Sequence, residues 1–325
     1  MSALANVAIH SSQFPENVRR DLLDSLRARR IAHKFHYDSV KQTQKWLALH
    51  QRFSPSRHDE NCRAIYEQGF KAAAEQVKAK LVHLIGLGCG GGQKDTRLLK
   101  RLKTAGKEVF YTPCDVAAAM VLTARRTALA VCPEKNCFPL VCDLETARNV
   151  SAIFDLPDAR HASRVITFFG MIPNFEPANI LSKLASLVGP KGYLLFSANL
   201  APGKDYAAGV KKILPQYDNG PTRDWLLTFL WDLSVEKSDG ELRFEVESKG
   251  GLKRIVANFE FKRPRRIEIE EKQFNFKRGE TVRLFFSYRY TPERVRKLLK
   301  VHGLEICEQW IAESGEEGVF LCRKN

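Results

Sequence analysis

The run from Leu81 to Gly92 constrains the fold of this chain more than any other stretch. Residues 81–87 are almost entirely apolar, which is typical of a strand buried in a parallel sheet. Glycines at positions 88, 90 and 92 follow, and they let the backbone turn tightly and approach a ligand without Cβ clashes. A helix over residues 94–102 is predicted next. The run therefore indicates the strand–turn–helix unit of a ligand-binding α/β sheet.

The ends of the next three predicted strands narrow the choice of ligand. Strand 109–114 ends in Asp115, about twenty residues beyond the glycines, where a carboxylate accepts hydrogen bonds from ribose hydroxyls. Strand 138–142 ends in Asp143, and strand 164–169 runs into residues 170–175. No Gly-Lys-Ser/Thr accompanies the glycines, which argues against nucleoside triphosphates. Ribose and adenine without pyrophosphate describe S-adenosylmethionine, and we favour this ligand over an ordinary sheet whose strand ends carry aspartates.

Strands and helices alternate from 80 to 198, which predicts a doubly wound parallel α/β sheet. The alternation then stops, because residues 241–247, 254–261 and 267–274 alternate polar and apolar like antiparallel strands. We therefore expect a smaller α+β lid domain beside the sheet. The predicted boundaries are 1–60 for the first part of the lid, 61–199 for the cofactor-binding domain, 200–285 for the inserted lid, and 286–325 for the completion of the main sheet.

Composition limits the partners and the compartment. The net charge is +15, but the basic residues are spread along the chain, which favours solvated helix faces over a nucleic-acid footprint. The eight cysteines show no CxxC pair or zinc spacing, so we expect reduced thiols and no metal. No apolar run is long enough to span a membrane, and the start lacks the features of a signal peptide. A cytoplasmic monomer is predicted.

Several blocks of the sequence together resemble the S-adenosylmethionine-dependent histidine Nα-methyltransferases of ergothioneine biosynthesis and related enzymes that methylate other aromatic amino acids. The blocks follow the order of the family and cover most of the chain. They are 34–38, 53–57, the glycine turn with Lys94 and residues 96–99, 112–116, 169–177 and 286–293. The Gly-x-x-x-Asn-Phe-Glu-Pro block at 170–177 is far more specific than the glycine turn. The resemblance implies a Rossmann-like class I methyltransferase fold.

The resemblance also implies roles for individual residues. The cofactor S-adenosylmethionine, and its product S-adenosylhomocysteine, would be held by Gly88, Gly90, Lys94, Asp115, Asp143 and Leu144. The amino-acid substrate would face Tyr37, Phe53, Asn174, Tyr217, Phe285 and Ser287. Asn174 and Tyr217 are the residues expected to act in catalysis, because an amide and a phenol can hold an α-amine and a carboxylate. On their own, a loop-capping asparagine and a core tyrosine would be the simpler interpretations.

Three positions depart from the family pattern. Phe285 stands where histidine enzymes carry a glutamate that pairs with the imidazole, and Phe53 stands where they carry a tyrosine. An imidazole that faced phenylalanine would lose a charge-assisted hydrogen bond of about 1.5–3 kcal/mol. We therefore expect an apolar aromatic side chain or a modified histidine in the substrate, rather than plain histidine. Gly86 stands where methyltransferases usually carry an acid, so either cofactor binding is weaker or a nearby group compensates.

The leading hypothesis is an N-methyltransferase that acts on the α-amino group of a free amino acid. The task of such an enzyme is to align an amine lone pair with a methyl group, and no convincing general base is visible in the sequence. Two alternatives remain open at this point. One is a nucleic-acid or other small-molecule methyltransferase, although residues 172–175 do not follow the order of the usual catalytic tetrapeptide. The other is a cofactor-binding pseudoenzyme, which Gly86 and Phe285 suggest.

Overall fold

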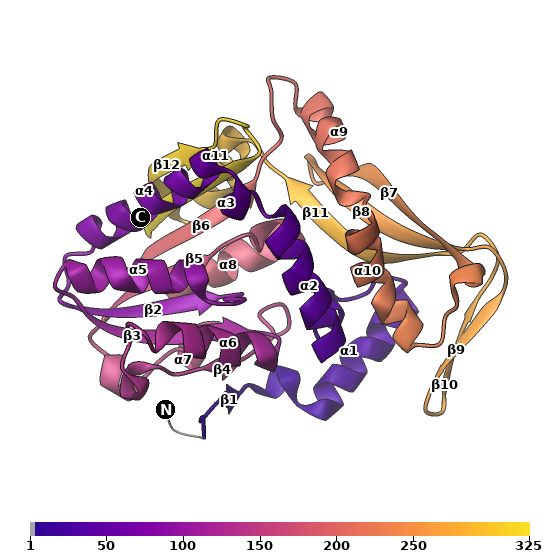
Figure 1. The fold of residues 1–325 in the computed structure, drawn as a ribbon, viewed down its shortest axis with the longest axis horizontal. Coiled ribbons are helices and arrows are strands. Elements are labelled where there is room, and N and C mark those ends of the chain that lie inside the picture. Colours follow the sequence, from indigo (N-terminus) through magenta and orange to yellow (C-terminus); the bar gives the residue numbers. More distant parts are fainter. Residues whose placement is uncertain (1–3) are drawn as a thin grey trace. The chain divides into compact units, whose positions relative to one another are not determined.

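The computed structural model describes residues 4–325, which form two compact units. The first unit takes in the chain up to Gln13, Pro55–Leu200 and Tyr290–Asn325, and the second takes in Phe14–Ser54 and Ala201–Arg289. Figure 1 shows the elements of both units along the chain. Each unit is described by itself below.

Within the described residues, the first unit contains an eight-stranded sheet in the order β1-β4-β3-β2-β5-β6-β13-β12. Neighbouring strands from β1 to β6 in this order are parallel, and β13 is antiparallel to both β6 and β12. The strands are β1 (Ala8–Ile9), β2 (Leu81–Leu87), β3 (Glu108–Asp115), β4 (Leu140–Val141), β5 (Ser163–Phe168), β6 (Tyr193–Asn199), β12 (Leu304–Ile311) and β13 (Glu317–Lys324). The predicted parallel α/β sheet with a closing hairpin is confirmed.

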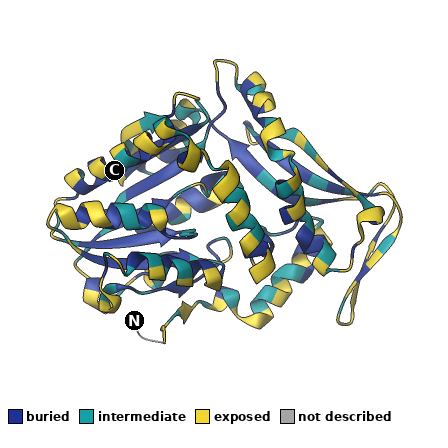
Figure 2. Ribbon diagram, in the orientation of Figure 1, coloured by how far each residue is buried: buried dark blue, intermediate teal, exposed yellow. Residues whose placement is uncertain are grey.

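Helices cover both faces of this sheet. On one face α4, α5 and α6 contact one another in sequence, and on the other α8 contacts both α7 and α11. These helices, with the short α3, are α3 (Pro55–His58), α4 (Glu60–Gln76), α5 (Gln93–Thr104), α6 (Ala118–Ala128), α7 (Val150–Ile153), α8 (Pro177–Val188) and α11 (Pro292–Val301). Short 3-10 turns lie at Ser11–Gln13, Glu134–Asn136, Pro157–Ala159 and Ile172–Asn174, the last of which is η5. The strands between the two helix layers are correspondingly buried (Figure 2).

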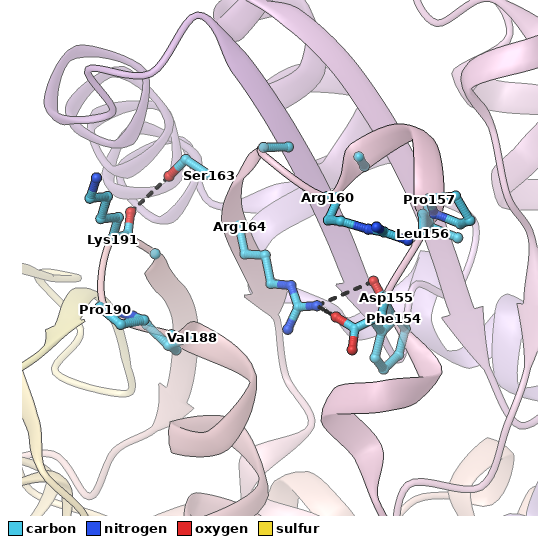
Figure 3. A pocket seen from close by; sticks show the side chains of 14 residues that line it. Phe154, Asp155, Leu156, Pro157, Arg160, Ser163, Arg164, Val188, Pro190 and Lys191 are labelled. Carbon is cyan, nitrogen blue, oxygen red and sulfur yellow. Dashed lines mark hydrogen bonds and ion pairs between the residues drawn. The ribbon is translucent and has the colours of Figure 1, made fainter.

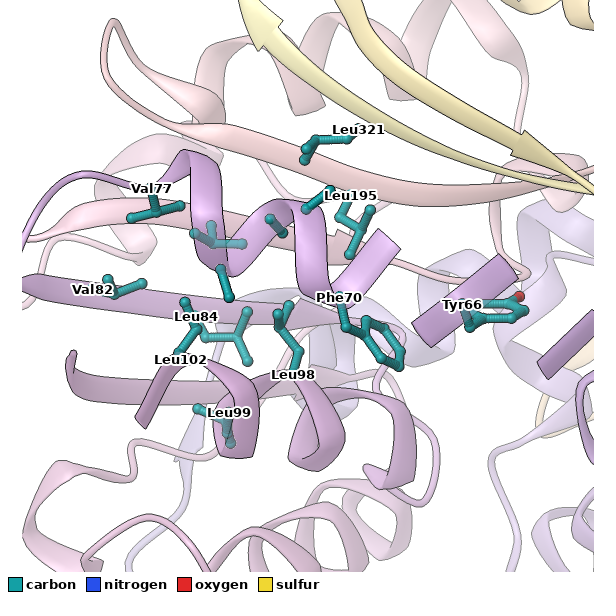
Figure 4. Packing of buried hydrophobic residues seen from close by; sticks show 14 of the residues in the cluster. Tyr66, Phe70, Val77, Val82, Leu84, Leu98, Leu99, Leu102, Leu195 and Leu321 are labelled. Atoms are coloured by element: carbon teal, nitrogen blue, oxygen red, sulfur yellow. The ribbon is translucent and has the colours of Figure 1, made fainter. Parts of the chain in front are cut away.

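The main core of the first unit lies between the sheet and the face of α4 and α5 (Figure 4). Leu98, Leu99 and Leu102 line one side of α5 at helical spacing and are fully buried. They pack with Val82 and Leu84 of β2 in the same cluster. This packing fixes α5 against β2, and so fixes the turn that joins them.

The second unit is built on a three-stranded antiparallel sheet in the order β11-β8-β7, with a separate hairpin of β9 and β10. Its strands are β7 (Gly240–Lys249), β8 (Leu252–Phe261), β9 (Arg265–Ile269), β10 (Lys272–Phe276) and β11 (Thr281–Arg289). The N-terminal segment joins this unit through a backbone bridge between Arg30 and Arg283. Its helices are α1 (Pro15–Ala28), α2 (Val40–Phe53), α9 (Tyr206–Tyr217) and α10 (Gly220–Asp232), with short turns η2 (His33–His36) and η6 (Lys237–Asp239).

The structure corrects several details of the sequence predictions. The third strand of the main sheet spans two residues instead of 138–142, and β1 was not predicted. The stretch 267–274 is a hairpin rather than one strand, because Glu270 turns the backbone with a positive φ of 50°. The units also divide at other residues than predicted: the described residues up to Gln13 and residues 55–60 belong to the first unit, and 286–289 to the second.

Candidate functional site

The glycine turn between β2 and α5 requires glycine at its ends for two separate reasons. Gly88, Gly90 and Gly92 all have positive φ, at 59°, 50° and 74°. A Cβ atom at Gly88 would lie 2.6 Å from Cγ of Met171, and one at Gly92 would lie 2.7 Å from Cα of Ala124. The turn is therefore held close to the segment after β5 and to α6.

Asp115, the last residue of β3, is fixed against this turn. Its Oδ2 accepts a hydrogen bond from the Gly90 amide at 3.1 Å, and its Oδ1 accepts one from the Ala117 amide at 3.1 Å. Burial raises the pKa of Asp115, while the backbone amides oppose the rise. A carboxylate has about four lone-pair positions, so both oxygens retain capacity for ribose hydroxyls. Asp115, for which ribose binding is predicted, thus lies at the tip of β3 beside the glycine turn.

Asp143 and Leu144 follow β4 directly. The carboxylate of Asp143 closes its own turn, because it accepts hydrogen bonds from the Glu145 amide and the Thr146 hydroxyl, both at 2.9 Å. The carbonyl of Leu144 accepts a hydrogen bond from Nζ of Lys183 at 2.6 Å. Both predicted residues are buried and held in place, so their local contacts define the shape of the loop next to β3.

Lys94 lies at the start of α5 against two aromatic rings of the first unit. Its Nζ lies 3.9 Å from the ring centroid of Tyr66 and 5.6 Å from that of Phe169. Burial lowers the pKa of Lys94, and the nearby Glu317 carboxylate opposes this effect. A half-buried cation beside the glycine turn is suited to a ligand carboxylate. The sequence prediction for Lys94 is the more general one that it helps to hold the cofactor.

Asn174 ends the η5 turn that follows β5. The backbone N–H of Asn174 donates a hydrogen bond to the backbone carbonyl of Met171 at 2.9 Å, and the residue is half-buried. Met171 is the residue that contacts Gly88, so the turn that carries Asn174 and the glycine turn are braced against each other. The first unit therefore places five of the predicted positions, Gly88, Gly90, Asp115, Asp143 and Asn174, at the carboxyl ends of its parallel strands, where such sheets bind ligands.

In the second unit, Tyr217 and Ser287 are brought together across 70 residues of sequence. Their oxygens lie 2.8 Å apart, and Nη2 of Arg289 donates a hydrogen bond to the Tyr217 oxygen at 2.8 Å. Either hydroxyl can be the donor in the hydrogen bond between Tyr217 and Ser287, so one hydroxyl proton of the pair remains for a ligand. This trio presents a hydroxyl donor beside a cation, which is suited to a carboxylate.

Phe285 lies among aromatic rings of the same unit. Its ring centroid is 6.0 Å from Tyr217, 5.9 Å from Trp225 and 5.6 Å from His33. Tyr37 joins them, at 5.5 Å from Trp225 and 5.3 Å from His33. We call these five rings (His33, Tyr37, Tyr217, Trp225 and Phe285) the aromatic cluster.

The aromatic cluster carries no formal charge near neutral pH. Burial lowers the pKa of His33 to about 3, with the neighbouring His36 as a minor cause, so its imidazole is neutral and a weak base. The Nε2 atom of His33 lies 3.2 Å from the Tyr37 hydroxyl. Of the predicted substrate residues, Phe53 is not brought into the cluster: it ends α2, is 44% exposed, and lies under the Arg52 guanidinium at 5.3 Å.

Three residues of this site were missed from the sequence. Arg289 follows Phe285 and Ser287 at every second position, and this period of two was a readable signal for one strand face. His33 and Trp225 carried no such signal, because their partners are distant in sequence.

A hollow of about 620 Å³ lies elsewhere in the first unit (Figure 3). It is lined by residues between 154 and 164 and between 188 and 192, which precede or begin β5 and β6. It therefore lies at the amino ends of these strands, opposite to the edge that carries the predicted cofactor residues. None of the predicted site residues lines it.

The parallel sheet, its glycine turn and the aspartate at the tip of β3 define the class of this protein, the Rossmann-like α/β fold of class I methyltransferases. Residues 18–324 match the family described as histidine-specific, S-adenosylmethionine-dependent methyltransferases, and the chain belongs to this family.

Individual relatives are more distant. The N-methyltransferase imqF of Aspergillus flavus is 24% identical over 242 residues, which cover 72% of this chain and 66% of that protein. A putative methyltransferase from Thermobifida fusca has a TM-score of 0.49 at 13% identity, over 91% of this chain and 94% of that one. An S-adenosylmethionine-dependent methyltransferase from Clostridium acetobutylicum has a TM-score of 0.45 at 15% identity, over 87% and 98%.

The residues present fit the cofactor of the family, S-adenosylmethionine. Side chains at Gly88 and Gly92 would collide with Met171 and Ala124, so only glycines let the turn keep this shape at the carboxyl end of β2. Asp115 supplies acceptors for ribose and Lys94 a cation for a carboxylate.

Among residues 4–325, no helix is long and apolar enough to cross a membrane.

Proposed function

We propose that this protein is an S-adenosylmethionine-dependent N-methyltransferase that acts on the α-amino group of a free amino acid with an apolar aromatic side chain or a modified histidine. Membership of the family supports the cofactor and the transfer of a methyl group. The observation that carries the choice of substrate is the position of Phe285 inside an uncharged aromatic cluster. Rings that lie edge-to-face or tilted around one position favour an aromatic ligand over a charged one.

Different residues of the chain bind the cofactor and the substrate in this proposal. When bound, S-adenosylmethionine supplies a methyl group on a sulfonium, whose sulfur keeps the bonding electrons when the amine lone pair takes the methyl carbon. Asp115 accepts hydrogen bonds from the ribose hydroxyls, and the Lys94 ammonium pairs with the cofactor carboxylate. Asn174 offers one acceptor and two donors, so it can orient an α-amine. Tyr217 and Ser287, with Arg289 behind them, bind the substrate carboxylate.

No side chain in this proposal acts as a strong base. His33 has a pKa of about 3, because burial disfavours its charged form, and it therefore accepts protons poorly near neutral pH. The α-ammonium accordingly loses a proton to solvent before transfer, which frees the lone pair that attacks the methyl carbon. The contribution of the protein is positioning, which is worth several orders of magnitude in rate for a reaction between two bound groups.

The test is an amino-acid panel with two matched variants. Wild-type protein is incubated with S-adenosylmethionine and with tryptophan, phenylalanine, tyrosine or histidine, and products are read by mass spectrometry. We expect methylation of an apolar aromatic amino acid in preference to histidine, by about tenfold or more, the value of one charge-assisted hydrogen bond. Phe285→Glu should shift this preference toward histidine, because it returns a carboxylate to the cluster.

The control is Phe286→Glu, the same change on the next residue of β11. Phe286 points away from the cluster and lies under the guanidinium of Arg254 at 4.9 Å, so its replacement should leave the preference unchanged. A wild-type preference for plain histidine would overturn the substrate assignment. Tight cofactor binding with no methylated product from any amino acid would favour a pseudoenzyme instead.

A further inference from the structure

The space beside Gly86, near the end of β2, is filled by a carboxylate from another element. A Cβ atom at Gly86 would lie 2.0 Å from Oδ2 of Asp95 and 2.9 Å from its Cγ. Asp95 lies in the first turn of α5 and is only 3% exposed. Glycine at position 86 is therefore what leaves room for this carboxylate beneath the glycine turn.

Hydroxyl groups from the two strands that flank β2 hold the Asp95 carboxylate in place. The Tyr111 hydroxyl of β3 donates to Oδ2 at 2.8 Å, and the Thr167 hydroxyl of β5 donates to Oδ1 at 2.7 Å. Each of these hydrogen bonds stabilises the ionised form of the acid. The Asp95 carboxylate is thus buried, has a defined donor on each oxygen, and lies where residues of the adjacent strands β3, β2 and β5 come together.

The charge of Asp95 also depends on its surroundings. Burial raises the pKa of Asp95 to about 6, and the hydrogen bonds from Thr167 and Tyr111 and the nearby Lys94 ammonium oppose the rise. The group is therefore mostly ionised above about pH 7. A single negative charge then lies in a poorly solvated position under the turn that approaches the ligand.

We propose that Asp95 is a positioning residue of the cofactor site, whose buried charge favours the cationic sulfonium of S-adenosylmethionine over the neutral thioether of S-adenosylhomocysteine. The two compounds differ by one positive charge and a methyl group, and charges in a shielded interior interact over longer distances than in water. The chain thus keeps an acid at the base of the turn although residue 86 is glycine, because α5 supplies it instead of β2. This inference rests on the proposed cofactor.

The test measures the affinities of both compounds for wild type and for Asp95→Asn by calorimetry at pH 7.5. The asparagine keeps the shape of the side chain and loses the charge. The affinity ratio is the affinity for S-adenosylmethionine divided by that for S-adenosylhomocysteine. We expect this ratio to be about tenfold lower in Asp95→Asn than in wild type, the size of one charge interaction in a partly shielded site. An equal loss of both affinities, or an unchanged ratio, would show that Asp95 only supports the fold and would overturn the proposal.

The control is Glu67→Gln on α4. Glu67 also anchors α5, because it forms ion pairs with Arg97 and Arg101, but it is not at the turn. Its loss loosens the same helix without removing the buried charge, so the affinity ratio should stay at the wild-type value. If wild type binds neither compound, the proposed function fails, which is a different result from an unchanged ratio.

A pH titration of wild type keeps the proposal testable if Asp95→Asn does not fold. The titratable groups that face Asp95 are Lys94 on its own helix, Tyr111 on β3 and Cys89 in the turn, with the Thr167 hydroxyl on β5. Burial raises the pKa of both Tyr111 and Cys89, so neither becomes charged below pH 7. Protonation of Asp95 should therefore lower the affinity ratio as the pH falls from 7.5 to 5, and a flat ratio would contradict the proposal.

Discussion

Gly88 and Gly106 are two residues with the same kind of backbone and different surroundings. Both have positive φ, at 59° and 74°. A Cβ atom at Gly88 would meet Met171, whereas one at Gly106 would meet nothing within 4 Å. The pair therefore separates the conformational role of a glycine from its role in letting two segments of the chain pack closely.

We expect Gly88→Ala and Gly106→Ala each to lower the free energy of unfolding by about 1 kcal/mol, from the backbone alone. Gly88→Ala should lose somewhat more, because Met171 must move. Only Gly88→Ala should weaken the binding of S-adenosylmethionine, by about tenfold or more. Urea unfolding and calorimetry measure the two effects. Equal cofactor affinities in both variants would mean that this turn does not hold the cofactor.

At the scale of the element, β11 depends on a bulge to present its site residues. The register with β8 shifts between Arg283 and Phe285, which leaves Leu284 as the extra residue. Nε2 of the buried His36 donates a hydrogen bond to the Leu284 carbonyl at 2.6 Å. This contact sets which face of β11 carries Phe285 and Ser287.

His36→Phe should destabilise the protein by about 1–3 kcal/mol, because it leaves the buried Leu284 carbonyl without this donor. His161→Phe, an exchange at an exposed position, should change stability by less than about 0.5 kcal/mol. Chemical denaturation measures the free energy of unfolding of wild type and of both variants. Similar stability for both would show that the histidine does not support the bulge.

Most of the main sheet was predictable because its strands are short apolar runs between clear breaks, whereas the two-residue β1 was missed. Two features of the second unit were also missed, for physical reasons. Helix α9 contains Pro215, which argues against a helix, and the turn at Glu270 has none of the usual turn residues. The residues of the aromatic cluster are distant in sequence: His33 and Phe285, for example, are 252 residues apart. Only tertiary packing therefore reveals the cluster.

At the scale of the whole molecule, the buried His36 and His83 and the half-buried His33 make stability depend on pH. Burial lowers the pKa values of His33 and His83 to about 3 and that of His36 to about 4. The unfolded chain binds protons on these rings below about pH 6.5, and the folded chain does not until the pH is far lower. Folding is therefore penalised as the pH falls through this window.

We expect the free energy of unfolding to decrease between pH 6.5 and 5, by up to about 1.4 kcal/mol per pH unit for each histidine. Asp95, Asp115 and Asp38 act in the opposite direction, because burial raises the pKa of each carboxyl group and its protonation adds stability as the pH falls. His83→Gln should reduce the slope by the share of one group. Urea unfolding at a series of pH values measures the slope, and a flat or rising stability on acidification would contradict the account.

We propose that the glycine turn and the carboxylate at the tip of β3 bind the adenosyl group of the cofactor. Calorimetric titration of S-adenosylhomocysteine into wild type and Asp115→Asn tests this role. We expect one site per chain in wild type and an affinity about tenfold lower or worse in the variant, because the proposed ribose contact and the bond from the Gly90 amide both depend on the Asp115 carboxylate. No binding to wild type, or equal binding to both proteins, would contradict it.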